Sequence, residues 1–531
     1  MEYLTHHLLE TSASTDPSKE ALVHGERRLS YEELDTLTTR LANALIDAGL
    51  QRMDRVGIYL EKCVEQVIAM LAVSKAGGVF VPINHLLFPD QVDHILRDCR
   101  PQALVTSGAR LESIKGILRN NADLGAVFTT TASDVSLEGK LVLDGETILA
   151  RGAADPPRSR VISHDLAAIL YTSGSTGRPK GVMLSHANLI AGSRIVSTYL
   201  KINSEDRIVS IVPFSFDYGL NQLLTGLEHG ATVVLLNFRF PNDVVQCLID
   251  ERITGLAGVP SFWSLLAQPS SSLHRHEFPR LRYITNTGGA MPQPVLAKLR
   301  ESLPDTDVIL MYGLTEAFRS TYLPPEELDR RPTSMGRAIP DTEIYVLNEH
   351  GKPCAPGEPG ELVHRGPTVS LGYWGNTEAT NRVLRPNPMS PPELRDTEKV
   401  CYSGDLVTMD EDGFLYFQGR RDSAIKSAGY RISATEIESV LVAIDGVREA
   451  AAIGVPDEVL GQSIVGIVVP HDGETLEIDE ILTSCAEKMP RYMMPKHVEI
   501  VADLPKTAHG KIDYQSLRSR VNSGGNPSDE S

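Results

Sequence analysis

Helical segments alternate with short β-branched runs along most of the chain, and this alternation constrains the fold more than any other feature. The segment 30–49, SYEELDTLTTRLANALIDAG, begins with a capping box of Ser30 and Glu33 and ends at Gly49. Its leucines recur at helical spacing: Leu34, Leu37, Leu41 and Leu45. Strand-like runs such as RVGIYLE, GVFVPIN and QALVTS follow, separated by further helical segments. The pattern predicts mixed α/β layers with a substantial amount of parallel sheet.

The length of 531 residues predicts more than one domain, because a single hydrophobic core does not grow that large. After Tyr402 the sequence changes to Gly-rich strands and turns, with a hairpin signal at Asp412-Gly413. A helix and two strands then predict a small α+β unit of about 100 residues. The Pro-rich segment 384–399 is interpreted as a surface loop of the large domain, and residues 521–531 as a disordered tail.

Composition indicates a cytoplasmic enzyme. The formal net charge of −18 argues against a broad surface for nucleic acid or anionic membranes, so neither partner is expected. The six cysteines stand alone, without a C-x-x-C pair or a histidine cluster, which fits a reducing compartment. We find neither a signal-peptide pattern at the amino terminus nor an apolar run long enough to span a membrane.

The loop YTSGSTGRPKGV, residues 171–182, combines glycines, hydroxyls and two basic side chains, Arg178 and Lys180. Glycines allow close approach of the backbone, and the hydroxyls, amides and cations suit a polyphosphate. The Walker pattern is not met, because Gly177 is followed by Arg178 and Pro179. A flexible surface turn is the alternative.

Four further stretches carry candidate chemistry. MYGLTEAFRS contains Thr315 and Glu316, a carboxylate able to hold magnesium, and YSGDL contains Asp405, able to accept ribose hydroxyls. PKTAHGKID presents Lys511. Taken singly, Glu316 is also explained as a solvated carboxylate and Asp405 as a turn-forming aspartate, and Lys511 is better explained as a surface lysine. GRRDSAIKSAGYRIS gathers several charged and glycine residues in one turn: Arg420, Asp422, Lys426, Gly429 and Arg431.

In this order and spacing the five motifs resemble those of the adenylate-forming superfamily, which comprises acyl-CoA synthetases, luciferases and adenylation domains of nonribosomal peptide synthetases. The resemblance covers nearly the whole chain. It implies an ATP- and acid-binding domain over residues 1–420, a hinge at 421–422, and a mobile lid domain over 423–520. The implied activity is the ATP-dependent activation of a carboxylic acid with Mg²⁺.

The resemblance also implies roles for individual residues. Glu316 would bind the metal, Thr315 the α-phosphate, and Lys511 the carboxylate and α-phosphate during adenylation, while Asp422 falls at the hinge. Gly429 and Tyr430 would reach the thiol channel after the lid rotates. The remaining nucleotide contacts would come from Thr172, Ser173, Gly174, Ser175, Thr176, Gly177, Lys180, Gly288, Gly289, Ala290, Tyr312, Gly313, Asp405 and Arg420.

These roles fit the chemistry. A carboxylate is a poor electrophile, so it first attacks the α-phosphate and expels pyrophosphate, which leaves a mixed anhydride. Magnesium and Lys511 would stabilise the charge that develops on the phosphoryl oxygens. A thiol then displaces AMP.

The stretch PFSFDYG bears on the identity of the acid. It lacks the histidine of the P-x-F-H motif of many acyl-CoA synthetases and resembles the F-D-x-S stretch of amino-acid-activating domains. Asp217 would then anchor the substrate's α-ammonium, or else be satisfied by a neighbouring donor such as Asn221 or Arg319. Arg319 would either receive a second carboxylate or neutralise Asp217. The acid pocket is expected to contain Asp217, Tyr218, Asn221, Gly258, Thr285, Met311, Arg319 and Ser320.

Several stretches of the sequence are similar to those of AMP-forming ligases of exosortase A systems and of free-standing prolyl carrier-protein ligases. This similarity favours transfer of an aminoacyl group to the phosphopantetheine of a separate acyl or peptidyl carrier protein. Two other classes remain open. One is an acyl- or aryl-CoA ligase that uses free coenzyme A, and the other is a non-catalytic adenylate-binding relative.

Overall fold

The structure is a computed structural model that describes residues 2–523 except 159–160, 173–178, 395–396, 421–424, 428–429, 433, 458–460, 490–492 and 508–509. The chain forms two compact units. Unit 1 contains Met1–Thr172, Pro179–Ile344 and His364–Cys401, and unit 2 contains residues 345–363 and the described residues from 402 onward. The predicted hinge at 421–422, including Asp422, lies outside the described residues.

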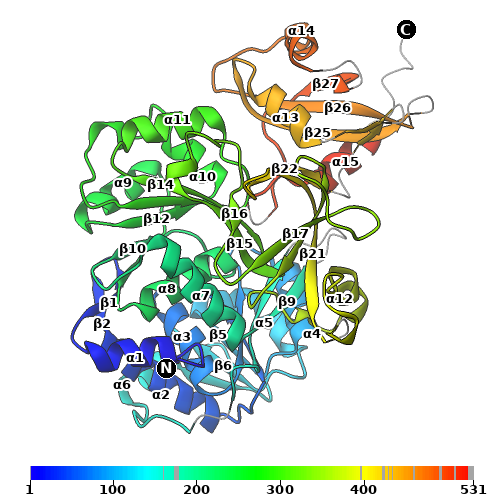
Figure 1. The fold of residues 1–531 in the computed structure, drawn as a ribbon. Coiled ribbons are helices and arrows are strands. Elements are labelled where there is room, and N and C mark those ends of the chain that lie inside the picture. Colours follow the sequence, from blue (N-terminus) through cyan, green and yellow to red (C-terminus); the bar gives the residue numbers. More distant parts are fainter. Residues whose placement is uncertain are drawn as a thin grey trace. The chain divides into compact units, whose positions relative to one another are not determined.

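The first sheet of unit 1 has nine strands in the order β16-β15-β14-β13-β12-β10-β11-β1-β2 (Figure 1). Its central strands are parallel, whereas β2, β15 and β16 are antiparallel to their neighbours. The strands are β1 (Glu20–His24), β2 (Arg27–Ser30), β10 (Arg207–Ser210), β11 (Thr232–Leu235), β12 (Gly255–Gly258), β13 (Tyr283–Asn286), β14 (Asp307–Leu314), β15 (Ala317–Leu323) and β16 (Arg337–Ala338).

The second sheet of unit 1 has eight strands in the order β19-β9-β8-β4-β3-β5-β6-β7. Strands β3 to β8 pair in parallel, and β9 and β19 extend the sheet in antiparallel fashion. The strands are β3 (Arg55–Tyr59), β4 (Val79–Ile83), β5 (Ala103–Thr106), β6 (Ala126–Thr129), β7 (Leu141–Asp144), β8 (Leu166–Thr172), β9 (Lys180–Ser185) and β19 (Gly372–Tyr373). Both sheets confirm the predicted fold class of mixed, substantially parallel α/β layers.

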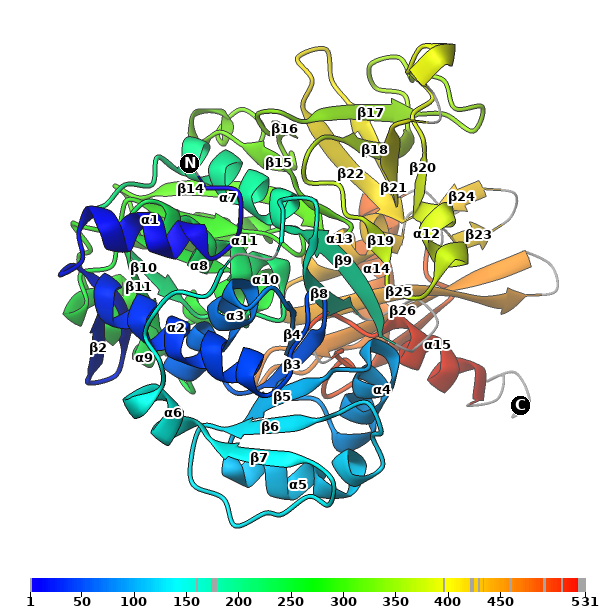
Figure 2. The same ribbon diagram turned by 90° about the horizontal axis from the view of Figure 1, so that it is seen from below.

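Helices α2, α3, α7 and α8 lie between these two sheets (Figures 1 and 2). One hydrophobic cluster joins buried residues of these helices to buried residues of both sheets. The predicted capping box is confirmed at the start of α2, where the Ser30 side chain accepts from the backbone of Glu33. The helices of unit 1 are α1 (His7–Thr15), α2 (Tyr31–Asp47), α3 (Val64–Lys75), α4 (Pro89–Cys99), α5 (Gly108–Arg119), α6 (Gly145–Arg151), α7 (His186–Leu200), α8 (Asp217–Glu228), α9 (Pro241–Asp250), α10 (Pro260–Leu266), α11 (Gln293–Ser302) and α12 (Thr377–Val383).

A third sheet has the order β17-β18-β21-β20, with β22 also paired to β21. Its strands are β17 (Glu343–Leu347), β18 (Gly360–Arg365), β20 (Leu384–Pro386), β21 (Lys399–Met409) and β22 (Leu415–Arg420). The predicted hairpin is confirmed between β21 and β22, where Gly413 has a φ of +83°. The prediction of a loop over 384–399 is wrong at its start, because Leu384 is buried and Leu384–Pro386 pairs with β21.

The small α+β unit is confirmed around a fourth sheet, in the order β24-β23-β26-β25 with β27 paired to β26. Residues of α13 and α14 pack on one face of β25 and β26, and α15 packs on the other. The elements are β23 (Ile425–Ser427), β24 (Tyr430–Ile432), α13 (Ala434–Val442), β25 (Val447–Asp457), β26 (Gly461–Pro470), α14 (Ile478–Lys488), β27 (His497–Ile500) and α15 (Tyr514–Ser523).

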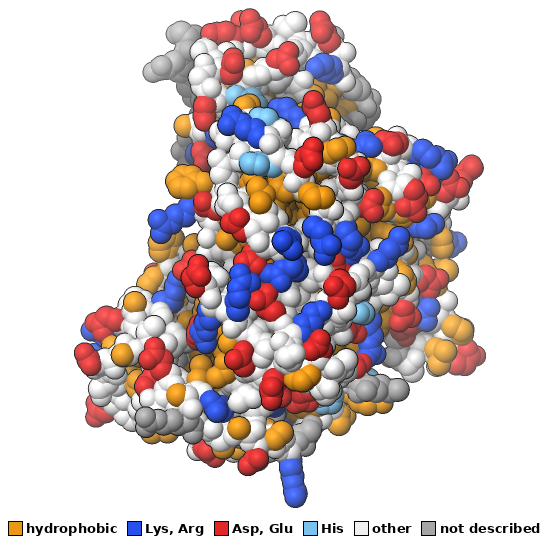
Figure 3. Space-filling view, turned by 90° about the vertical axis from the view of Figure 1, so that its left-hand side faces the viewer, with side chains coloured by type: hydrophobic (Ala, Val, Ile, Leu, Met, Phe, Trp, Pro, Cys, Tyr) orange, Lys and Arg blue, Asp and Glu red, His pale blue; other side chains and the backbone are white. Residues whose placement is uncertain are grey.

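Acidic and basic side chains are interspersed on the face drawn in Figure 3, rather than gathered into separate areas of one sign. Many basic groups have an acidic neighbour; for example, Arg28 pairs with Glu251 at 2.6 Å and Arg300 with Asp329 at 2.7 Å. Within the described part of the chain, we find no helix with the length and apolarity needed to cross a bilayer.

Gly192 of α7 provides a test of the packing between this helix and β15. A Cβ at Gly192 would overlap the Phe318 ring, whereas a Cβ at Gly116 of α5 would meet nothing within 4 Å. We expect Gly192→Ala to lower the free energy of unfolding by about 1–3 kcal/mol through overpacking. Gly116→Ala is the control and should raise it by about 0.5–1 kcal/mol, because alanine favours a helix. Calorimetric unfolding of both variants checks the prediction, and equal shifts in the same direction would contradict it.

Candidate active site

The hairpin of β14 and β15 carries the residues expected at the metal, the α-phosphate and the acid. Thr315 and Glu316 form its turn, and Arg319 follows on β15. The register shifts between Tyr312 and Leu314, and a Cβ at Gly313 would lie only 3.0 Å from the Arg319 Cα. Arg319 itself has a φ of +71°, which is unusual for a residue with a side chain. The hairpin therefore contains a bulge that redirects Arg319, and Gly313 leaves room for it.

Asp217 begins α8 and points at this hairpin. Its carboxylate accepts hydrogen bonds from Arg319 Nη1 at 3.2 Å and from Thr315 Oγ1 at 3.3 Å. Of the two alternative donors expected from the sequence, Arg319 is the one observed. Asp217 thus has a cationic partner within the protein, which weakens the reason for expecting an amino group on the substrate.

Other residues expected at the acid lie around the same pair. The Tyr218 hydroxyl donates to the Thr285 carbonyl at 2.8 Å and lies 2.6 Å from the Thr285 hydroxyl. The Arg319 guanidinium lies 4.7 Å from the centre of the Tyr218 ring. Burial raises the pKa of Tyr218, so the hydroxyl remains neutral. Met311 joins the same hydrophobic cluster as Tyr218.

Ser320 and Gly258, both expected in the acid pocket, contact groups other than Asp217 and Arg319. The Ser320 hydroxyl donates to the carbonyl of Ala317 on its own strand. Gly258 ends β12, and a Cβ there would overlap Phe262 and Trp263 of α10. Asn221 lies one turn after Asp217 on α8, and its Nδ2 has no hydrogen-bond partner within the described residues.

Glu316 and Lys180 converge on Tyr373 of β19. The Tyr373 hydroxyl donates to the Glu316 carboxylate at 2.5 Å, and Lys180 Nζ lies 5.5 Å from the Tyr373 ring centre. Lys180 begins β9 and pairs in register with Thr172 at the end of β8. The expected phosphate residues Ser173, Gly174, Ser175, Thr176 and Gly177 lie outside the described residues. Lys180, at the end of the predicted phosphate loop, and Glu316, the predicted metal ligand, therefore share Tyr373 as a neighbour. Tyr373 was not expected from the sequence.

The residues expected around adenine follow β13 and end β14. Gly288, Gly289 and Ala290 are exposed, and the Gly289 carbonyl accepts from Asn286 Nδ2 at 3.0 Å. Tyr312 stacks on His364 with ring centres 6.0 Å apart. His364 is 1% exposed, its ring nitrogens find no partner among the described residues, and burial lowers its pKa to about 3. A neutral imidazole therefore supports Tyr312, and nothing in the sequence had marked it.

Unit 2 contains the residues expected at the ribose and at the reacting carboxylate. Asp405 and Arg420 face each other across β21 and β22, with Arg420 Nε 3.3 Å from Asp405 Oδ1. Lys511 is exposed in a turn in which its carbonyl accepts from Thr507. Tyr430 begins β24, and Gly429 lies outside the described residues.

A polar cavity of about 40 Å³ lies where β3, β4 and β10 end, and the sequence analysis missed it. Its lining includes Lys62, Gln66 and Ser215. Ser215 precedes Asp217 by two positions in the sequence. Lys62 Nζ donates to the Ser210 carbonyl at 2.7 Å, and burial lowers the pKa of Lys62. The volume suits a few ordered water molecules.

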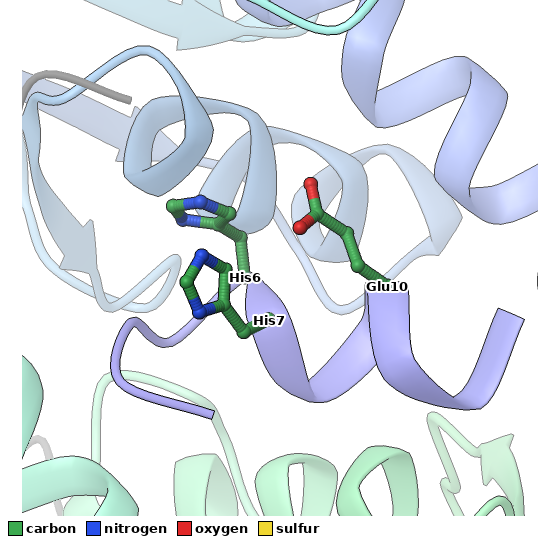
Figure 4. Close-up of side chains that lie close together, drawn as sticks. All are labelled: His6, His7 and Glu10. Atoms are coloured by element: carbon green, nitrogen blue, oxygen red, sulfur yellow. The ribbon is translucent and has the colours of Figure 1, made fainter. Parts of the chain in front are cut away.

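One group of side chains in the described part of the chain has the spacing of a metal site, namely His6, His7 and Glu10 at the start of α1 (Figure 4). Glu10 pairs with Lys75 at 3.1 Å, and His6 Nδ1 lies 3.0 Å from the Ser74 hydroxyl. Magnesium prefers oxygen ligands, so this group is not suited to the expected Mg²⁺. Glu316 offers carboxylate oxygens, the kind of ligand that Mg²⁺ prefers.

Two family models match this chain. The AMP-binding enzyme family matches residues 9–374, and the AMP-binding enzyme C-terminal domain matches residues 436–511. The chain belongs to the adenylate-forming superfamily. Like its relatives, this adenylate-forming enzyme is an AMP-forming acid–thiol ligase, and the predicted fold and enzyme class are confirmed.

Relatives of both expected kinds were found. The feruloyl-CoA synthase of an Amycolatopsis species is 32% identical over 96% of this chain and 97% of its own length. Tyrocidine synthase 1 of Brevibacillus parabrevis is 30% identical over 96% of this chain, which spans only 44% of that relative. ATP-bound MatB from Rhodopseudomonas palustris superimposes with a TM-score of 0.87 at 28% identity, covering 97% of this chain and 98% of MatB.

The Asp217–Arg319 pair predicts a strong energetic coupling. Arg319→Met leaves a largely buried carboxylate without its cation, so we expect it to lower the free energy of unfolding by about 3 kcal/mol. Asp217→Asn in the same chain should restore most of that loss. Calorimetric unfolding of the single and double variants measures the coupling, and additive losses would show that the pair does not matter for stability.

Proposed function

We propose that this adenylate-forming enzyme joins an acyl or aryl acid to free coenzyme A through an acyl-adenylate. The observation that carries this proposal is the pairing of Asp217 with Arg319. An aspartate that anchors a substrate ammonium needs that ammonium as its cation, and here the protein supplies one. The similarity to feruloyl-CoA synthase along nearly its whole length also supports a free-standing ligase.

The positions of the phosphate-side residues support the following division of roles. Lys180 and the loop before it bind the phosphates of ATP, and Glu316, oriented by Tyr373, binds Mg²⁺. When bound there, Mg²⁺ would supply positive charge to offset the charge that develops on the phosphoryl oxygens. Tyr312, supported by His364, stacks on adenine near Gly288, Gly289 and Ala290.

We further propose that Asp405 and Arg420 bind the ribose, and that Lys511 pairs with the carboxylate during adenylation. The lid would span 423–520 and turn about Asp422, which brings Gly429 and Tyr430 to the thiol. The proposed cytoplasmic location rests on the six isolated cysteines.

A second candidate is an aminoacyl ligase that serves a carrier protein. It is favoured by the position of Asp217 in the motif and by the similarity to tyrocidine synthase 1. It requires that a substrate ammonium replace Arg319 as the partner of Asp217.

The two candidates are separated by ATP–pyrophosphate exchange across amino acids and their matched des-amino acids. We expect exchange with des-amino or aryl acids, followed by formation of a coenzyme A thioester that mass spectrometry detects. Lys511→Ala should lower the exchange rate by about 100-fold or more, because it removes charge stabilisation in the transition state. Exchange confined to amino acids and abolished by Asp217→Asn would instead establish the aminoacyl ligase.

Tyr373 provides a test of the metal assignment. Tyr373→Phe removes the hydrogen bond that orients Glu316, so we expect the Mg²⁺ concentration for half-maximal exchange to rise about 10-fold. The matched control is Tyr514→Phe, which removes the 2.7 Å hydrogen bond from Tyr514 to Glu438 in unit 2. An unchanged magnesium dependence in Tyr373→Phe would refute the role of Tyr373 at the metal.

A further inference from the structure

The guanidinium of Arg319 is buried but only partly satisfied. The residue is 2% exposed, and its Nη1 donates to Asp217 Oδ2 at 3.2 Å. Its Nε and Nη2 are sealed from solvent and find no acceptor among the residues that the structure describes. Buried donors without acceptors are rare in folded proteins, so these two nitrogens call for an explanation.

The geometry of the side chain suggests which group they bind. Nε and Nη2 lie on the same edge of the planar guanidinium, and their N–H bonds point in parallel. This edge matches the two oxygens of a carboxylate and forms two parallel hydrogen bonds with it. Nη1, which Asp217 already uses, lies on another edge, so Asp217 does not compete for the unpaired one.

Within the described part of the chain, this edge of Arg319 has no hydrogen-bond acceptor. The rings of Tyr218 and Phe318, with centres 4.7 Å and 5.6 Å from the Arg319 Cζ, cover the guanidinium without accepting from its N–H groups. One turn after Asp217 on α8, Asn221 is 3% exposed, and its Nδ2 also finds no acceptor within the described residues. A ligand group that completes this environment must therefore accept hydrogen bonds.

We propose that the acid activated by this enzyme carries a second carboxylate, which binds the Nε and Nη2 of Arg319 with additional donation from Asn221. This inference rests on the proposed ligase function and names its substrate class, a dicarboxylic acid. Arg319 then bridges two carboxylates, and the α8 N-terminus and the Thr315 hydroxyl offset the charge of Asp217. The Asp217 side chain, which contacts Arg319, is 14% exposed.

The test compares each dicarboxylic acid of three to eight carbons with its monomethyl ester in ATP–pyrophosphate exchange. The ester keeps the chain length and one reactive carboxylate but removes the distal charge. For the preferred length we expect kcat/KM to be at least about 100-fold higher for the free diacid. Arg319→Lys keeps the positive charge but lacks the two parallel N–H groups, and Arg319→Met lacks both. Both variants should lose the preference for the free diacid. Arg300→Met at an exposed ion pair is the control and should retain it.

The outcomes separate this inference from the proposed function. Exchange with monoesters or monocarboxylic acids at rates equal to the diacids overturns the inference and leaves the ligase function intact. Exchange with no acid of any kind overturns the proposed function itself. If Arg319→Met fails to fold, the wild-type comparison still decides, and Arg319→Met/Asp217→Asn removes both charges of the pair together.

Discussion

The close approach of β14 to β15 at Gly313 is the constraint on which the site depends. Because glycine leaves room at this point, Arg319 adopts a left-handed backbone conformation, and the hairpin bulges. The bulge brings the Arg319 side chain to Asp217 on α8, while the turn of the same hairpin holds Thr315 and Glu316. On the far side, Phe318 packs where Gly192 of α7 leaves space for it. One local backbone irregularity therefore places the groups proposed for the acid and for the metal and α-phosphate on one hairpin and its neighbour.

The two halves of the site differ in their electrostatics. On the side proposed for the phosphates, Lys180 and the Glu316 carboxylate both approach Tyr373, which brings a cation and a carboxylate close together. On the acid side, a buried arginine and aspartate neutralise each other, and two arginine nitrogens remain unsatisfied among the described residues. A substrate with a further carboxylate completes the second half, whereas an ammonium would have to compete with a guanidinium that already pairs with Asp217.

Local signals predicted the fold well. The capping box at Ser30 and the β-branched runs identified helices and strands correctly, because these signals depend on neighbours along the chain. The loop predicted at 384–399 failed at Leu384, since its burial comes from pairing with β21 rather than from local composition. Likewise, the motifs located Glu316 and Tyr312, but not their partners. Tyr373 lies far from Glu316 in sequence, and His364 is a single histidine in a strand, so only the folded chain reveals their contacts. The sequence left Asp217 open between an amine anchor and a partner of Arg319, and the hydrogen bond to Arg319 now favours the second reading.

The most direct measurement is a crystal structure of this enzyme with the adenylate of its preferred dicarboxylic acid. The account predicts that both oxygens of the distal carboxylate lie within hydrogen-bond distance of Arg319 Nε and Nη2, while Nη1 remains on Asp217. A distal carboxylate that lies away from Arg319, with the Nε and Nη2 edge of Arg319 occupied only by water, would contradict it.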